Sequence, residues 1–203
     1  MSVAILKYSS CNVTSLSNCL KLINVKHYIC NSAKDLEFAS IIILPGVGTF
    51  EGVIEEMRKN KTYDIIRKKA KNGCKIIGIC IGMQILADTG SELISKKTKG
   101  LGLIRGHVKK MKKFHIGWNH LNSDSKSLKD LSGYCDKNFY FNHSNYIQLN
   151  EKKNMRFYSF NENIKIPSII IKKNIFGFQF HPEKSQAIGG KLLNFCIKKN
   201  YEN

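Results

Sequence analysis

The segment G-I-C-I-G, residues 78–82, places a cysteine between two glycines where a buried apolar run gives way to a helical pattern. In a tight strand-to-helix turn, glycines two residues away on each side remove atoms that would clash with the central residue's backbone. Cys80 would then project from the strand end, where the positive end of the following helix favours a reactive thiolate. The N–H of Ile81 would point to where an oxyanion forms. The alternative is that Cys80 is a small core residue at an ordinary turn.

The other cysteines favour that alternative by number. The chain has seven cysteines, and no two of them form a C-x-x-C pair. An odd number at such spacings suits neither a zinc site nor a disulfide framework. In a reducing compartment most of them would be small buried apolar residues. We therefore predict no metal site and no cofactor, and Cys80 needs independent support as a nucleophile.

A thiolate nucleophile needs a base, and the segment F-Q-F-H-P-E-K-S, residues 178–185, supplies a candidate. Alternate residues of an extended chain point to the same side, so Glu183 could hydrogen-bond one ring nitrogen of His181. The other nitrogen would remain for Cys80. Both Cys80 and His181 follow apolar strands, and reactive groups collect at the carboxyl ends of strands in open parallel sheets. For H-P-E alone, an exposed histidine beside a surface glutamate is an equal alternative.

The third segment with chemical potential is P-G-V-G, residues 45–48, at the end of another apolar strand. Gly46 and Gly48 relieve side-chain crowding, so the backbone N–H groups between them could face a ligand. The alternative here is an ordinary turn, which is the usual explanation of an isolated G-x-G.

The elements that must position these residues alternate between apolar runs and helical patterns. Such alternation predicts an α/β fold in which helices flank a mostly parallel central sheet. We predict one domain over residues 1–203. The expected strands are 3–8, 26–30, 39–45, 74–79, 100–111, 137–146 and 175–183, the last running into a loop; the expected helices are 14–23, 63–71, 81–90 and 189–199.

Composition narrows the class of protein. Hydrophobic residues form 42% of the 203 residues, as in a soluble globular protein, and the start of the chain resembles a first strand rather than a signal peptide. No run is long enough for a membrane span, so we predict a cytoplasmic protein. The net charge of +18 invites a nucleic-acid interpretation. The basic residues are scattered in short groups, however, which favours an anionic metabolite or an acidic protein partner.

Taken together and in order, P-G-V-G, G-I-C-I-G-M-Q-I-L and F-Q-F-H-P-E-K-S resemble the class I (triad) glutamine amidotransferases. Within that family, H-I-G-W-N (residues 115–119) and Y-F-N-H-S (residues 140–144) resemble additional signatures of the glutaminase subunits of imidazole glycerol phosphate synthase. The likeness extends over almost the whole chain.

The resemblance implies that Cys80 attacks the side-chain amide of glutamine, forming a thioester and releasing ammonia. His181, oriented by Glu183, would carry the protons. The N–H groups of Ile81 and Val47 would hold the oxyanion. The residues implied in glutamine binding are Gly46, Gly48, Gln84, His143 and Ser144.

The resemblance also implies a partner. In the family the ammonia passes to a (β/α)8-barrel synthase subunit of the HisF type, with which the glutaminase forms a heterodimer. That partner makes imidazole glycerol phosphate in histidine biosynthesis. The G-W-N segment and Lys184 would lie near it, and neither nucleic acid nor a membrane is implied.

Two departures from the family pattern keep alternatives open. Residues 7–15 read K-Y-S-S-C-N-V-T-S, where the family usually has D-Y-G-x-G-N-x-x-S, and Asn145 replaces the tyrosine of H-S-Y. One alternative is a paralogue that supplies ammonia to a partner forming an amidine in surface-sugar biosynthesis. A second is a non-catalytic binding module that keeps only the fold.

Overall fold

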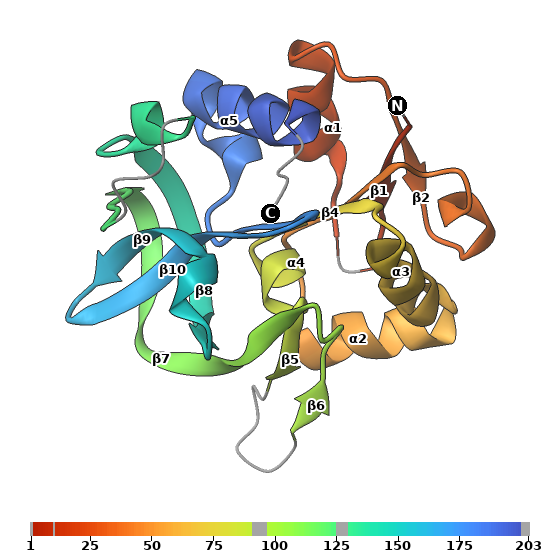
Figure 1. Cartoon of the computed structure of the whole chain (residues 1–203), viewed down its shortest axis with the longest axis horizontal. Coiled ribbons are helices and arrows are strands. Elements are labelled where there is room, and N and C mark those ends of the chain that lie inside the picture. The colour runs from red at the N-terminus through yellow and green to blue at the C-terminus, as the bar shows by residue number, and fades with distance from the viewer. Residues whose placement is uncertain (1, 10, 91–96, 125–129, 200–203) are drawn as a thin grey trace.

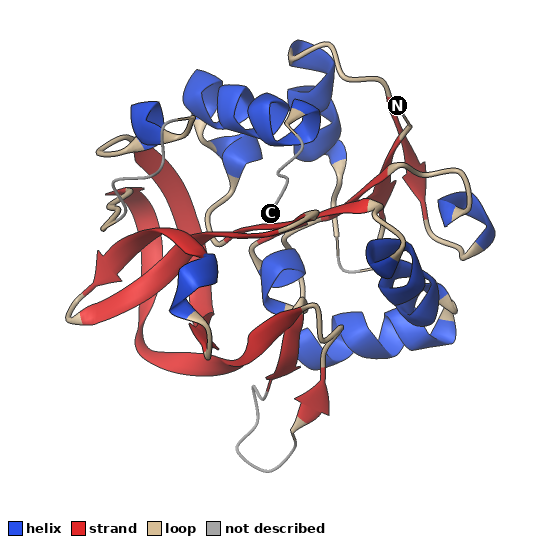
Figure 2. Ribbon diagram, in the orientation of Figure 1, coloured by secondary structure: helices blue, strands red, loops and turns tan. Residues whose placement is uncertain are grey.

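A central sheet separates two layers of helices (Figures 1 and 2). The computed structural model describes residues 2–9, 11–90, 97–124 and 130–199. Helices α1 (Thr14–Leu22) and α5 (Gln186–Lys198) cover one face. Helices α2 (Phe50–Lys59) and α3 (Thr62–Lys71) and the single turn α4 (Ile81–Gln84) cover the other. The predicted α/β fold with a mostly parallel central sheet flanked by helices is confirmed.

Among the described residues, the central sheet has the strand order β2-β1-β3-β4-β11-β10-β9. The first five strands of that order run parallel, and β10 and β9 continue the sheet antiparallel. Strands β1, β3, β4 and β11 are buried along their whole length, which is why they appear in the sequence as continuous apolar runs. The strands are β1 (Val3–Leu6), β2 (His27–Cys30), β3 (Ile41–Leu44), β4 (Lys75–Ile79), β9 (Met155–Asn161), β10 (Ile164–Lys172) and β11 (Ile175–Phe178).

A second, smaller sheet in the described part of the chain has the order β6-β5-β7-β8. Its long antiparallel pair is β7 with β8, and β5 runs parallel to β7. The register of the pair sets His115 opposite His143, so the H-I-G-W-N and Y-F-N-H-S segments lie side by side. The strands are β5 (Ala87–Gly90), β6 (Thr98–Lys99), β7 (Ile104–His120) and β8 (Asn138–Leu149).

The prediction of a helix over residues 81–90 is wrong beyond Gln84. The helix ends there, and Ala87–Gly90 forms β5. Residues 81–87 are all buried and so show no alternation that separates helix from strand, and the short polar segment Asp88–Thr89 after them adds none. Pairing with β7 therefore decides the conformation.

The strand predicted over residues 100–111 is also wrong in its bounds. β7 begins at Ile104 and runs on to His120. A register shift against β8 between Lys110 and His115 interrupts the alternation of buried and exposed residues in its middle. Exposed lysines in that stretch hide the strand from the sequence pattern.

Helix α2 occupies residues for which no helix is predicted, although its signal is present. Thr49 caps it by accepting a hydrogen bond from the Gly52 N–H at 3.2 Å. Its buried residues Phe50, Val53, Ile54 and Met57 follow helical spacing. The remaining helices are confirmed with shifted ends, and Gly73 follows α3 with the positive φ of 87° expected in the C′ position. Short 3₁₀ turns are Lys34–Leu36, Ser132–Tyr134, Lys152–Asn154 and Pro182–Lys184.

Lys75, the first residue of β4, holds the end of α5. Its buried Nζ donates to the carbonyl oxygens of Cys196 (3.0 Å), Ile197 (2.7 Å) and Lys199 (2.7 Å). Carbonyl groups in the last turn of a helix have no intrahelical donor, and a cation there is favourable. The Lys75 ammonium thus caps α5 and joins it to the central sheet.

Replacing this cation should destabilise the protein. For Lys75→Met we expect the free energy of unfolding to fall by about 1.5–3 kcal/mol, because hydrogen bonds from a charged donor are lost and buried carbonyls are left without a partner. Urea denaturation followed by circular dichroism measures this. Lys191→Met, on the exposed side of the same helix, should change stability by less than about 0.5 kcal/mol. Equal midpoints for the two variants would contradict the capping role.

Across the described residues, no helix is both long enough and apolar enough to cross a membrane.

Candidate active site

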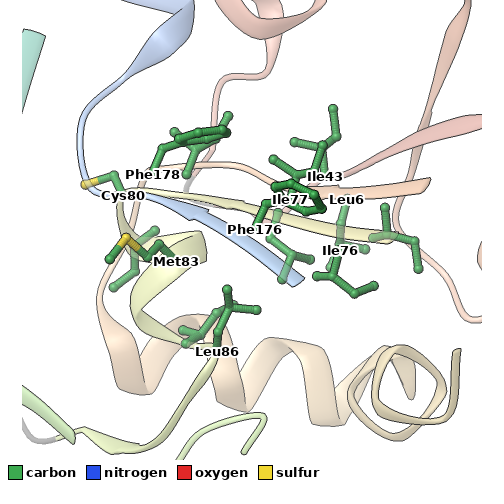
Figure 3. Close-up of a cluster of buried hydrophobic side chains, with 14 of the residues drawn as sticks. Leu6, Ile43, Ile76, Ile77, Cys80, Met83, Leu86, Phe176 and Phe178 are labelled. Atoms are coloured by element: carbon green, nitrogen blue, oxygen red, sulfur yellow. The ribbon is translucent and has the colours of Figure 1, made fainter. Parts of the chain in front are cut away.

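Cys80 lies between β4 and α4 in a strained backbone conformation, with φ 49° and ψ −110°. A residue with a side chain rarely adopts a positive φ, and such strain persists only where the surrounding structure enforces it. The Cys80 N–H donates to the Phe178 carbonyl at 2.7 Å, which fastens the turn to β11. In Figure 3 Cys80 lies at the margin of the buried hydrophobic cluster, with its sulfur directed away from the labelled core side chains.

Both glycines of G-I-C-I-G are required by close backbone packing. A Cβ on Gly78 would lie 2.4 Å from the Gly82 carbonyl oxygen, and a Cβ on Gly82 would lie 2.0 Å from the Leu44 carbonyl oxygen. Neither gap accommodates a carbon atom. The turn therefore folds back on its own strand and packs against the end of β3, as the sequence motif predicts.

The segment after β11 presents His181 and Glu183 together. His181 Nδ1 and Glu183 Oε1 are 2.8 Å apart, and their side chains are only 4% and 9% exposed. The backbone of His181 is held by two further bonds: its N–H donates to the Tyr140 carbonyl at 2.8 Å, and its carbonyl accepts from Ser185 Oγ at 2.6 Å. Strand β8 thus fixes the position of the imidazole, and Glu183 fixes its orientation.

The thiol and the imidazole meet above Gly46. The side chains of His181 and Cys80 are hydrogen-bonded. A Cβ on Gly46 would lie 2.9 Å from both Cys80 Cβ and His181 Cε1, so only glycine leaves room for the pair. Burial lowers the pKa of His181, but interactions with Cys80 and then with Glu183 outweigh burial and raise that pKa to about 10. A cysteine whose thiol proton can pass to an adjacent, carboxylate-oriented imidazole is the arrangement of an activated cysteine nucleophile.

The two amides predicted to hold an oxyanion differ in their surroundings. Ile81 is the first residue of α4, where backbone N–H groups have no intrahelical acceptor. Because α4 contains only four residues, the positive charge at its start is that of a single turn. The Val47 backbone, in contrast, donates a hydrogen bond to the Cys11 thiol.

Cys11 lies in the segment 7–15, at a position where the family resemblance leads us to expect a glycine. Burial, with a smaller contribution from the nearby Glu183, raises the pKa of Cys11 to about 11 despite the hydrogen bond from Val47. Cys11 is therefore a neutral thiol at physiological pH, unsuited to nucleophilic attack. The hydrogen bond from Val47 and the charge of Glu183 both act on Cys11, and they link segment 7–15 to the site.

Gln84 lies in a buried polar group beside the nucleophile and is 2% exposed. Its Nε2 donates to the Asn145 carbonyl at 2.8 Å and to Gln179 Oε1 at 3.3 Å, and Gln179 Nε2 is 3.8 Å from Cys80 Sγ. Gln179 is absent from the predicted site. The signal was available, because Gln179 alternates with His181 along an extended segment and shares its side of the chain.

Strand β8 forms the opposite wall. Cys80 Sγ donates to the Asn142 carbonyl at 3.8 Å, and His143 Nδ1 is 2.8 Å from the Asn145 carbonyl. His143 is buried, and Ser144 beside it is half-buried. Gly48, two residues after Gly46, has a φ of 125° that favours glycine. Within the described residues, no group of three or more His, Cys, Asp or Glu side chains could hold a metal ion.

A thiol, an imidazole and a carboxylate in series, at the ends of β4 and β11 of a mainly parallel sheet, define the class of α/β proteins that transfer acyl groups through a cysteine. Comparison with known proteins narrows this class: the family described as "Glutamine amidotransferase class-I" matches residues 5–198. The chain belongs to the class I glutamine amidotransferase family, and the curated relatives described next are named as subunits of one particular synthase. The family resemblance predicted from the motifs is confirmed.

Two of these relatives are named "Imidazole glycerol phosphate synthase subunit HisH" and "HisH 2". The protein of Bacillus cytotoxicus is 34% identical, with 94% of this chain and 91% of that protein covered. The protein of Methanococcus maripaludis is 35% identical, with coverage of 97% and 99%. Among solved structures, "Structure of PurLQS from Thermotoga maritima" has a TM-score of 0.74 at 19% identity and covers 97% of each chain, a similarity of fold.

Proposed function

We propose that this chain is the glutaminase subunit of an imidazole glycerol phosphate synthase. It hydrolyses glutamine to glutamate and ammonia and delivers the ammonia to a synthase partner. The observation that carries the proposal is the convergence of Cys80 and His181 on Gly46, with Glu183 2.8 Å behind the imidazole. Two relatives that match this chain over more than 90% of their own length carry the name of this subunit.

The reaction follows from the charges of the three residues. The Cys80 sulfur attacks the side-chain carbonyl carbon of glutamine, and the oxyanion collapses to a thioester as the C–N bond breaks. The His181 imidazolium gives its proton to the leaving nitrogen, which departs as ammonia. Neutral His181 then takes a proton from water, whose oxygen attacks the thioester and releases glutamate. Glu183 stabilises the imidazolium each time it forms.

Stabilisation of the oxyanion is assigned to the N–H groups of Ile81 and Val47. Because one N–H cannot fully serve two acceptors, Val47 must release the Cys11 thiol to take this role. Glutamine binding is assigned to the groups around the nucleophile: Gly46, Gly48, Gln84, His143 and Ser144. The partly exposed Ser144 and the backbone of β8 are suited to contact the ligand directly.

The proposed partner is a (β/α)8-barrel synthase subunit of the HisF type, bound as a heterodimer. The surface supporting this is the outward side of β7, where Ile116 and Trp118 are 66% and 50% exposed. The exposed Lys184 follows the H-P-E segment. We further propose that residues 1–203 act as one amidotransferase domain in the cytoplasm, with no nucleic-acid or membrane partner.

The two alternatives have less support. The relatives described above are named for imidazole glycerol phosphate synthase rather than for surface-sugar amidination. A non-catalytic module would have no need for an imidazole that is buried, oriented by a carboxylate and hydrogen-bonded to a cysteine.

The decisive experiment combines this chain with a HisF-type subunit and the phosphorylated ribulosyl intermediate of histidine biosynthesis. Imidazole glycerol phosphate should form from glutamine only when this chain is present. Ammonium salts should support the barrel subunit alone, which is the control for an active partner. Amidination of a nucleotide sugar, with no imidazole glycerol phosphate from glutamine, would favour the surface-sugar alternative and refute the proposal.

A further inference from the structure

A row of polar side chains joins β7 to the wall of the site. Asn119 Nδ2 lies 3.0 Å from His115 Nε2, and His115 Nδ1 lies 3.1 Å from His143 Nε2. His143 Nδ1 in turn lies 2.8 Å from the Asn145 carbonyl oxygen. Both histidine residues are 6% exposed. The facing positions of His115 and His143 in the β7–β8 ladder bring the two rings together.

The two ends of this row fix the direction of every hydrogen bond in it. At one end the Asn119 Oδ1 accepts the His120 N–H at 2.8 Å, and Nδ2 also donates to the Phe160 carbonyl at 2.8 Å, so the group facing His115 is a donor. At the other end a carbonyl oxygen can only accept. Each ring must therefore carry its hydrogen on Nδ1 and accept at Nε2.

Both histidines are neutral in this arrangement. Burial lowers the pKa of His115 to about 4, and burial together with His115 lowers that of His143 to about 3. The His115 ring also stacks on Phe141, with 4.3 Å between ring centroids and 18° between planes. Protonating either ring would set two N–H groups against each other. The row is stable as a chain of neutral tautomers.

Beyond Asn145 the row reaches the nucleophile. The same carbonyl that accepts from His143 accepts from Gln84 at 2.8 Å, and Gln84 is bonded to Gln179 at 3.3 Å. Gln179 Nε2 faces Cys80 Sγ at 3.8 Å. Polar contacts therefore run without a break from β7 to the sulfur.

Strand β7 carries this row and the proposed partner surface on opposite sides. Ile116 and Trp118 face outward, whereas His115 between Phe114 and Ile116 faces inward and is buried. Strand β8, which pairs with β7, contacts both parts of the triad: the Tyr140 carbonyl accepts the His181 N–H at 2.8 Å, and the Asn142 carbonyl lies 3.8 Å from Cys80 Sγ. A change in the position of β7 relative to β8 would therefore act on the His115–His143 hydrogen bond, which joins the two strands.

We propose that His115 is a positioning residue for glutamine hydrolysis: through His143 it holds the Asn145 carbonyl, and with it Gln84 and Gln179, in place against Cys80. This rests on the proposed glutaminase function. Without the His115 N–H, His143 can change tautomer and lose its bond to the Asn145 carbonyl. The row also gives partner binding at β7 a physical route to the nucleophile.

The first test measures tautomers and needs no catalysis. Nitrogen NMR of the imidazoles should show hydrogen on Nδ1 of both His115 and His143, assigned with His115→Phe and His143→Phe. Asn119→Asp should move the hydrogen of His115 to Nε2 and raise its pKa, because a carboxylate oxygen can only accept. Asn119→Ala should leave the pKa below its ordinary value. Hydrogen on Nε2 of either ring in the wild type would overturn the proposed direction of the hydrogen bonds in this row.

The second test measures catalysis. His115→Phe keeps the ring stacking but removes the N–H, and we expect kcat for glutamine to fall about 10- to 100-fold through misplacement of catalytic groups. His115→Asn, whose amide can donate towards His143, should recover part of the loss. His107→Phe on the same strand is the matched control and should retain wild-type kcat. Stimulation by the partner should weaken only in the His115 variants.

The outcomes separate this inference from the proposed function. An inactive wild-type pair with both hydrogens on Nδ1 would refute glutaminase function and leave the tautomers standing. An active wild type in which His115→Phe is folded by circular dichroism and matches His107→Phe in kcat and in partner stimulation would refute the positioning role. If His115→Phe does not fold, His115→Asn and Asn119→Ala decide: kcat at the wild-type value in both would also refute it.

Discussion

The Cys80→Ala protein is expected to lose glutamine hydrolysis by on the order of 10⁴- to 10⁶-fold, because no thioester can form without the sulfur. Binding and the remaining amides would supply the residual rate. Glutamate formation, measured with the synthase partner present, tests this. Cys135→Ala is the matched control, a half-buried cysteine in the turn before β8, and should hydrolyse glutamine at the wild-type rate. An undiminished rate in Cys80→Ala would refute the nucleophile assignment.

The backbone at Cys80 makes a second part of this prediction possible. A φ of 49° with ψ of −110° is strained for any residue that has a Cβ, and glycine adopts it more readily. Cys80→Gly should therefore be inactive and yet at least as stable towards urea as Cys80→Ala. A loss of stability in Cys80→Gly relative to Cys80→Ala would contradict the claim that the turn holds the cysteine under strain.

The second large effect is expected for His181→Ala, with a loss close to that of Cys80→Ala. Cys80 and Glu183 raise the pKa of His181, so removing the ring removes both the group that takes the thiol proton and the donor that protonates the leaving nitrogen. Because the two residues act in one step, the double variant should be no slower than either single variant. Additive losses would contradict this coupling.

A chemical measurement separates a catalytic loss from unfolding in His181→Ala. A glutamine-like electrophile should label Cys80 rapidly in the wild type and slowly in His181→Ala, since the thiolate is the attacking form. His120→Ala, at an exposed position on β7, is the control and should be labelled at the wild-type rate. Equal labelling rates in all three proteins would show that His181 does not activate the thiol.

The local motifs were predictable from sequence because each depends on neighbouring residues. The glycines of G-I-C-I-G avoid clashes within one turn. A Cβ on Gly78 would lie 2.4 Å from the carbonyl oxygen of Gly82, only four positions away. His181 and Glu183 meet because they are two residues apart in an extended segment. The continuous apolar runs of β1, β3 and β4 likewise report burial on both faces of a parallel sheet.

The features that were not predictable from sequence depend on strand pairing and on packing between distant segments. Ala87–Gly90 is a strand because it pairs with β7, and its own four residues carry no periodicity that would separate strand from helix. The meeting of His115 with His143 depends on the register of β7 and β8, and a shift of one residue would turn either ring to the other face. The hydrogen bond from Val47 to Cys11, and the electrostatic effect of Glu183 on that thiol, join three separate segments. Sequence determined the reactive groups and their immediate turns, whereas the tertiary structure alone determined what surrounds them, because register and packing between distant segments depend on the whole fold.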